Sequence, residues 1–166
     1  MIMKKIFVLA VCMTLVFCLS GCGFIQFMPS ADEIGESKTF EKDGIKLLLT
    51  DAYEEQVSEV GFYGYYVADF GAVMVERTTF KEHPECEGMT LDQFAQSYRN
   101  NNGHSMAIKH DDELVYYVSE KGGRTYYVFF YLGTDSFWTV QYACYTKDAP
   151  TLEFTFMLFA AAVEVE

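Results

Sequence analysis

Three side chains that can bind a metal ion lie together in the segment His83-Pro84-Glu85-Cys86. Imidazole nitrogen, thiolate sulfur and carboxylate oxygen are the ligands that zinc takes in proteins, and a structural site uses about four of them. His104 and His110 are the other histidines, but no spacing connects them to this segment. We interpret His83, Glu85 and Cys86 as metal candidates, with a solvated loop between a strand and a helix as the simpler interpretation, and we predict no cofactor.

Cysteine thiols provide a second kind of chemistry. Cys86 and Cys144 lie in the body of the chain, whereas the other three cysteines fall within the first 22 residues. In an extracytoplasmic protein such a pair can form a disulfide. The bond requires Cα atoms within about 7 Å of each other, and a sequence does not give that distance. The pair is therefore a disulfide candidate, and two free thiols are the alternative.

The sequence contains no recognisable catalytic motif. It has no Gly-x-Ser-x-Gly nucleophile turn. Gly122-Gly123 lacks the lysine of a phosphate-binding loop and is typical of a hairpin turn. The acidic pair Asp111-Asp112 falls in a predicted turn, where aspartate is common for conformational reasons. We therefore expect that the protein is not an enzyme.

The N-terminal segment has the parts of a secretory signal. Lys4 and Lys5 precede Ile6–Leu19, a stretch of 14 residues in which Thr14 is the one clearly polar side chain. As a helix this stretch would be about 21 Å long, short of the roughly 30 Å hydrocarbon core of a bilayer. A cleaved signal is therefore favoured over a membrane-spanning anchor.

The tetrad Leu19-Ser20-Gly21-Cys22 resembles the lipobox of bacterial lipoproteins. This resemblance implies that a diacylglyceryl group, with palmitate-type chains, is attached to Cys22 and that the chain is cleaved before it. Residues 1–21 are then the signal peptide, 22–38 the lipidated N-terminus and tether, and 39–166 the folded domain. Each buried methylene contributes about 0.8 kcal/mol, so two chains give durable anchoring. We expect a lipid-anchored protein on the extracytoplasmic face of the cell membrane.

Composition and charge limit the partners. The chain is 51% apolar and 17% aromatic, which is ample for one core, and its net charge is −12. Removal of Lys4 and Lys5 with the signal leaves ten basic residues against 24 acidic ones, a net charge of −14. Such a charge disfavours nucleic acid and anionic lipid headgroups.

The body of the chain shows mainly strand patterns. Strongly aromatic or β-branched segments, bounded by turn residues, predict antiparallel strands. One of them, Val73–Phe80, alternates so that Val73, Val75 and Arg77 face one way and Glu76 the other. The predicted strands are 39–40, 45–49, 62–70, 73–80, 105–110, 114–120, 125–132 and 136–145. Residues 51–59 are either a short helix or a loop.

Two helices are predicted. Thr90 and Gln93 match a capping box, and Leu91, Phe94, Ala95 and Tyr98 then share one face. The second helix lies within Asp148–Glu164, with Asp148 as its cap.

In the second helix, Leu152, Phe156 and Phe159 form one stripe, and Phe154, Leu158 and Ala161 are apolar on another side. This pattern predicts a helix well buried against the sheet. The end of the segment, from Val163 onward, can equally continue as extended chain.

Four segments and the terminal helix carry a family resemblance. The segments Phe40–Ile45, Thr90–Ala95, Tyr126–Tyr131 and Phe137–Tyr142 resemble the PsbP-like group of small secreted or lipidated domains found in Firmicutes. The resemblance implies an α+β fold: an α/β/α sandwich with a central antiparallel sheet of six to seven strands. It implies no general enzymatic activity. Photosynthetic relatives support a metal centre in a large complex, but no metal-ligand motif carries over to this sequence.

Tyrosine pairs suggest how the domain works. Tyr65-Tyr66, Tyr116-Tyr117 and Tyr126-Tyr127 each place one ring on either face of a sheet, because strand side chains alternate. Rings covered by helices are core, and rings left uncovered can bind a partner. We therefore expect a non-catalytic interaction or accessory domain of an envelope complex, or alternatively a module that binds a small ligand or a metal.

Overall fold

A computed structural model describes residues 35–111 and 113–166 of the chain. The predicted signal peptide, the predicted lipidation site Cys22 and most of the predicted tether lie outside the described residues. Within the described ranges, no helix is both long enough and apolar enough to cross a membrane.

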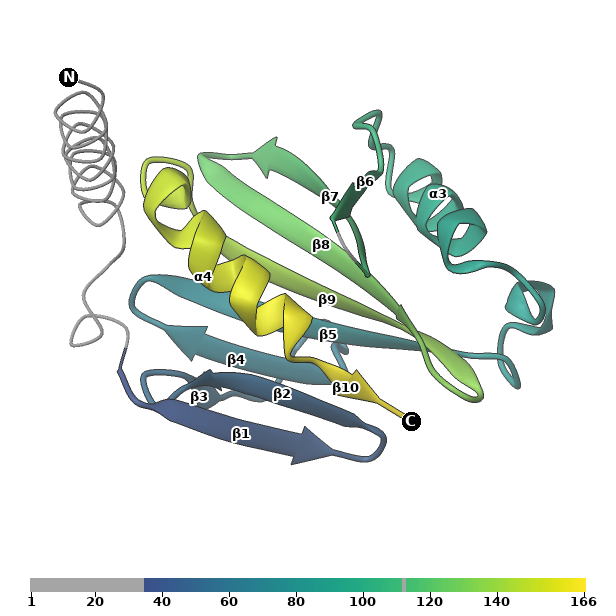
Figure 1. Cartoon of the computed structure of the whole chain (residues 1–166), viewed down its shortest axis with the longest axis horizontal. Helices are drawn as coiled ribbons and strands as arrows, with labels where there is room; N and C mark the ends of the chain where they lie inside the picture. The colour runs from purple at the N-terminus through teal and green to yellow at the C-terminus, as the bar shows by residue number, and fades with distance from the viewer. Residues whose placement is uncertain (1–34, 112) are drawn as a thin grey trace, which may run out of the picture.

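The central sheet contains seven antiparallel strands in the order β3-β4-β5-β9-β8-β7-β6 (Figure 1). Consecutive strands from β6 to β9 pair with one another and form the predicted meander. β9 lies at the centre and pairs with β5 on one side and β8 on the other. The strands are β3 (Glu54–Glu55), β4 (Gly64–Ala68), β5 (Gly71–Thr79), β6 (Lys109–Asp111), β7 (Leu114–Lys121), β8 (Arg124–Leu132) and β9 (Ser136–Tyr145).

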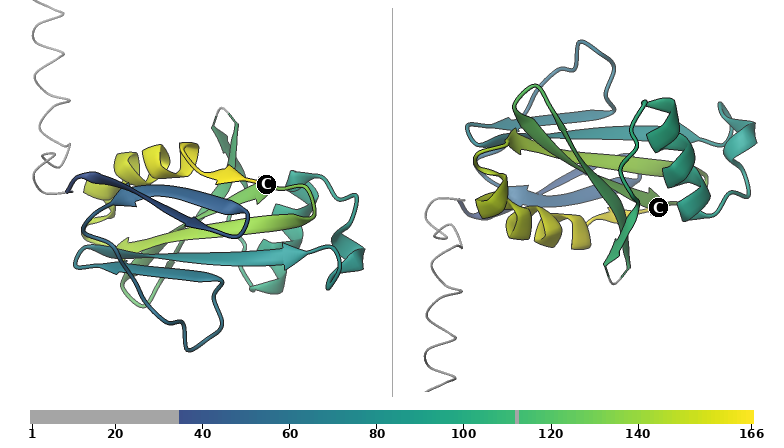
Figure 2. Two further views of the ribbon diagram at one scale, coloured as in Figure 1. Left: turned by 90° about the horizontal axis from the view of Figure 1, so that it is seen from below. Right: turned by 90° about the horizontal axis from the view of Figure 1, so that it is seen from above.

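Helices cover both faces of this sheet. α3 (Leu91–Asn101) packs on one face and α4 (Ala149–Ala161) on the other (Figure 2). The predicted α+β fold, with a central antiparallel sheet between helices, is confirmed.

A second sheet shares the layer of α4. It contains β1 (Ser37–Lys42), β2 (Ile45–Thr50) and β10 (Glu164–Val165) in the order β1-β2-β10. The sequence predicted the β1–β2 hairpin, but not that the end of the chain returns to pair with β2. Lys46 and Glu164 are joined there by an ion pair of 2.8 Å.

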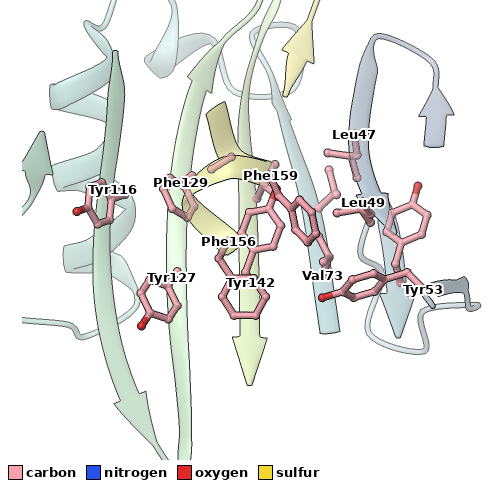
Figure 3. Packing of buried hydrophobic residues seen from close by; sticks show 14 of the residues in the cluster. Leu47, Leu49, Tyr53, Val73, Tyr116, Tyr127, Phe129, Tyr142, Phe156 and Phe159 are labelled. Carbon is pink, nitrogen blue, oxygen red and sulfur yellow. The ribbon is translucent and has the colours of Figure 1, made fainter. Parts of the chain in front are cut away.

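Alternation along the strands separates two hydrophobic clusters. Trp138, Val140 and Tyr142 of β9 face α4 and β2, whereas Phe137 faces α3. The cluster under α4 is the larger one, and Figure 3 shows Leu47 and Leu49 of β2 near Phe156 and Phe159 of α4. Tyr116 and Tyr127 belong to this cluster, while their sequence neighbours Tyr117 and Tyr126 contact the cluster under α3, as the alternation predicted.

Two segments differ from the expectation. Of the predicted strand 105–110, just Lys109 and His110 lie in β6, because Met106 and Ile108 pack into the cluster under α3 and the Met106 carbonyl accepts a hydrogen bond from Arg99. Residues 51–59 form a loop that contains the two-residue strand β3. In both places local contacts replace regular structure.

The predicted N-terminal cap is present in α3, but in α4 the predicted capping residue makes no capping hydrogen bond. The Thr90 hydroxyl accepts a hydrogen bond from the Gln93 amide, and the Gln93 side chain accepts one from the Thr90 amide, so the capping box is complete. Asp148 occupies the N-cap position of α4, but its side chain makes no capping hydrogen bond, and Pro150 lies in the first turn.

The capping box gives a test of how α3 is held. Replacing Thr90 by alanine removes the acceptor for the Gln93 amide, so we expect the free energy of unfolding to fall by about 1 kcal/mol. Urea denaturation followed by far-ultraviolet circular dichroism measures the change. Thr134→Ala, in the exposed turn before β9, is the control. An equal loss in both variants would contradict a specific role for the cap.

Candidate functional site

The predicted metal candidates do not converge on one point. His83 precedes the short 3-10 helix Pro84–Cys86, which contains Glu85; both side chains are exposed, and the His83 Nδ1 atom lies 3.2 Å from Glu85 Oε1. Cys86 instead packs against the cluster under α3. Within residues 35–111 and 113–166, no group of three or more His, Cys, Asp or Glu side chains is arranged to hold a metal ion.

The other two histidines have separate neighbours. The His104 ring lies 5.5 Å from the ring of Tyr117. His110 Nε2 lies 3.2 Å from Asp92 Oδ1, at the start of α3. Neither histidine is placed to complete a site with His83.

The predicted disulfide partners are not brought together. Cys86 and Cys144 are both free thiols. Cys144 lies opposite Gly71, at the start of β5, and faces α4. Cys86 follows the far end of β5, whose nine residues span about 27 Å, and contacts the cluster on the other face of the sheet. The separation depends on the strand register, which is why spacing along the chain did not show it.

The outer side of α4 is the most unusual surface of the domain. This helix of 13 residues contains one charged residue, Glu153. Its inner residues, such as Phe156 and Phe159, are buried, but Phe154 and Leu158 on the outer side are 49% and 54% exposed. The expectation of a well-buried helix is therefore wrong for this side, because the sheets cover only part of the helix circumference.

A groove of about 720 Å³ lies beside this exposed side. It lies between α4 and the turn that joins β6 to β7, and we call it the α4 groove. Its apolar lining residues are Phe154, Met157, Leu158, Ala160, Ala161, Val163, Leu114 and Tyr131, and its acidic ones are Asp111 and Glu113.

A hydrogen bond holds the helix over the sheet at this groove. The Tyr131 hydroxyl of β8 donates to the Ala160 carbonyl near the end of α4, at 2.9 Å. Burial raises the pKa of Tyr131 well above its ordinary value, so the phenol remains a neutral donor. The position of the groove wall is thereby fixed relative to the sheet.

Carboxylates lie beside the apolar floor. Asp111 and Glu113 are exposed at the β6–β7 turn, and Glu153 is exposed on α4. Burial raises the pKa of Tyr116, and the nearby charges of Asp111 and Glu153 raise it further, so both carboxylates act on the same tyrosine. The α4 groove is thus an apolar surface with an acidic rim.

A second hollow of about 750 Å³ lies at the other end of the central sheet, along β3 and β4. Acidic and small side chains, including Glu54, Asp69 and Ala52, line much of it. None of its lining residues is among the large apolar side chains that the described part of the chain exposes. The two hollows have similar volumes, but the exposed large apolar side chains favour the α4 groove as the binding surface.

A polar cluster joins α3 to the sheet on the opposite face. The Tyr98 hydroxyl lies 3.0 Å from both carboxylate oxygens of Glu76, and Gln141 Nε2 donates to Glu76 Oε1 at 2.8 Å. Burial raises the pKa of Glu76, and the hydrogen bonds from Tyr98 and Gln141 oppose that rise. The three side chains satisfy one another, which is typical of a structural link.

Sequence reasoning missed both features. For the α4 groove the sequence does contain a signal, which is a second apolar stripe on the helix. Leu152, Phe156 and Phe159 form the stripe that faces the core, so Phe154 and Leu158 must lie on another side. For the polar cluster no signal was present, because its members come from β5, α3 and β9 and meet only through the fold.

Comparisons with known proteins support the fold. No protein-family profile matches the sequence, and no curated protein matches it. A cyanobacterial PsbP (CyanoP) from Synechocystis is similar in structure, with a TM-score of 0.54 at 12% identity, over 79% of this chain and 92% of that one. At this identity the similarity supports a PsbP-like fold and nothing about activity.

Two further structures are similar at lower scores. A protein from Bacteroides thetaiotaomicron has a TM-score of 0.47 at 10% identity, over 80% of this chain and 49% of that one. LpqN of Mycobacterium tuberculosis, described as involved in cell envelope biogenesis, has a TM-score of 0.44 at 10% identity, over 78% of this chain and 90% of that one. Neither similarity is strong enough to support a shared function.

The two thiols should differ in reactivity. Cys144 is buried and its pKa is raised to about 11 by burial, so little thiolate is available at neutral pH. Without reductant, we expect iodoacetamide to modify Cys86 slowly in the native protein and Cys144 only after unfolding, as read by peptide mass spectrometry. If neither cysteine reacts after unfolding until a reductant is added, the free-thiol assignment fails.

Glu76 should make stability depend on pH. Its folded pKa is raised, so the stabilisation from its protonated form is complete below the unfolded value of about 4.5 and is lost as pH rises through the folded pKa. In urea titrations, the free energy of unfolding of the native protein minus that of Glu76→Gln should therefore fall as pH increases from about 4 to 7. Glu59→Gln, an exposed loop change, is the control for net charge. A difference that stays constant or rises with pH would contradict the assignment.

Proposed function

We propose that this protein is a lipoprotein, anchored through Cys22 on the extracytoplasmic face of the cell membrane, whose domain binds another envelope protein through the α4 groove. Its role is that of a non-catalytic accessory subunit. The observation that carries the docking part is the exposed apolar side of α4, with Phe154 and Leu158 about half exposed beside a groove.

The anchor limits where the partner is found. The described chain begins at Gly35, and twelve residues, 23–34, separate it from Cys22. Fully extended, they span at most about 45 Å. The domain of an anchored protein therefore stays near the membrane surface, and its partner must present a binding segment there.

The surface chemistry supports a protein partner. Large apolar side chains that remain exposed beside a groove are costly in water and mark interaction sites. Scattered exposed residues are ordinary, but Phe154 and Leu158 are one helical turn apart and border the same groove. Rigid backing from the Tyr131–Ala160 hydrogen bond favours a preformed binding surface.

Mass spectrometry tests the anchor. We expect the protein extracted from membranes to begin at Cys22 and to carry a diacylglyceryl group. A Cys22→Ser variant should lack the lipid mass and keep residues 1–21, because the thiol that forms the thioether is gone. A native protein that begins elsewhere, or begins at Cys22 without lipid, would refute the anchor.

Site-specific cross-linking in intact cells tests the docking surface. With photo-reactive benzoyl-phenylalanine in place of Leu158, we expect irradiation to give an adduct with another envelope protein. The same residue in place of Gln96, which is exposed on α3, is the matched control and should give none. Equal adducts at both positions, or none at Leu158, would argue against the α4 groove.

A further inference from the structure

We infer that the α4 groove binds a basic amphipathic helix of a partner protein. This inference rests on the proposed function and adds the chemistry of the partner. It follows from the spacing of the apolar side chains along α4 and from the charges around the groove.

The apolar spacing suits a helix. Phe154, Leu158 and Ala161 follow one another at intervals of four and three residues and cover about 10 Å of α4. A helix that lies in a groove places its anchors at the same kind of spacing, with an apolar side chain at nearly every turn. The small, exposed side chain of Ala161 allows the partner's backbone to approach closely at the end of the groove.

The charge around the groove is negative. Asp111 and Glu113 line it, and Glu153 lies one residue before Phe154 on α4. Lys109, two residues before Asp111 on β6, is directed to the Tyr116 ring, with its Nζ 5.8 Å from the ring centre. Lysine or arginine on the flanks of an incoming helix would complement this rim.

The end of α4 adds to the same field. The carbonyl end of a helix carries a partial negative charge, and cations are stabilising there. The last turn of α4 contains no basic residue, and this turn, with Ala160 and Ala161, lies at the groove. A basic side chain of the partner would supply the missing complement.

Other occupants of the groove have the wrong charge. A second copy would place acidic rim against acidic rim. The chain's own segment between Cys22 and Gly35 contains Asp32 and Glu33 and no basic residue. An anionic lipid surface would be repelled in the same way. Charge complementarity therefore favours a basic partner over all three.

Designed peptides test the inference on the full lipidated protein in phosphatidylcholine nanodiscs. The first peptide is a helix of about 18 residues with leucines along one face and lysines on the flanks. The second is identical but has glutamates for the lysines, and empty nanodiscs provide the lipid background. By fluorescence anisotropy, we expect the lysine peptide to bind at least about tenfold more tightly, with affinity that falls as salt rises. Equal binding of both peptides, or tighter binding of the glutamate peptide, would overturn the inference.

Two variants locate the binding. Leu158→Ser, an exposed change that the fold should tolerate, should abolish binding of the lysine peptide. The Asp111→Asn, Glu113→Gln double variant should remove most of the difference in affinity between the two peptides. Glu59→Gln, far from the groove in sequence and exposed, is the control and should change neither the binding of the lysine peptide nor the difference in affinity. Peptide binding that survives Leu158→Ser would overturn the inference, as would self-association that Leu158→Ser abolishes.

The outcomes for the two proposals differ. If the lysine peptide does not bind but cross-linking through position 158 still captures an envelope protein, the inference fails and the proposed function stands. If the peptide binds at the groove but no cross-link forms in cells, the groove chemistry stands and the proposed function fails.

Discussion

The alternation of side chains along β9 divides the domain into its two hydrophobic clusters. Trp138 and Tyr142 point toward α4 and β2, and Phe137 points toward α3. Since β9 pairs with both β5 and β8 along nearly its whole length, its register also fixes the faces of those strands. A slip of one residue would send every side chain to the opposite face. The positions of both helices, the separation of Cys86 from Cys144, and the floor of the α4 groove all depend on this register.

The two helices meet this sheet in different ways. α3 is amphipathic: its one apolar face, which includes the buried Phe94, packs on the sheet, Tyr98 on the same face contacts Glu76, and Thr90 caps its first turn. α4 is apolar on more sides than the sheets cover. Its outer side remains exposed, because the groove separates it from the β6–β7 turn. A helix that is apolar all round is normally buried all round. The exposed apolar side chains of α4 therefore do not serve the stability of the isolated domain.

Much of the fold was predictable from local sequence. The strands from β7 to β9, the capping box at Thr90 and the extent of α3 follow from alternation, turn residues and helix period, which act over a few residues. The β2–β10 pairing, the Glu76–Tyr98–Gln141 cluster and the distance between the thiols join segments far apart in the chain, so no local pattern encodes them. The α4 groove was predictable in part. The sequence shows the second apolar stripe of α4, but it does not show that no other element covers this stripe.

The pairing of β10 with β2 has a consequence for how the chain folds. β2 contributes Leu47 and Leu49 to the larger core, but the partners that close that core, Phe156 and Phe159, come from the last helix. The ion pair between Lys46 and Glu164 spans 118 residues of sequence. Contacts so distant form slowly, because a long loop must close first. Because synthesis proceeds from the N-terminus, the main core stays open until α4 and β10, about 120 residues after β2, have been made.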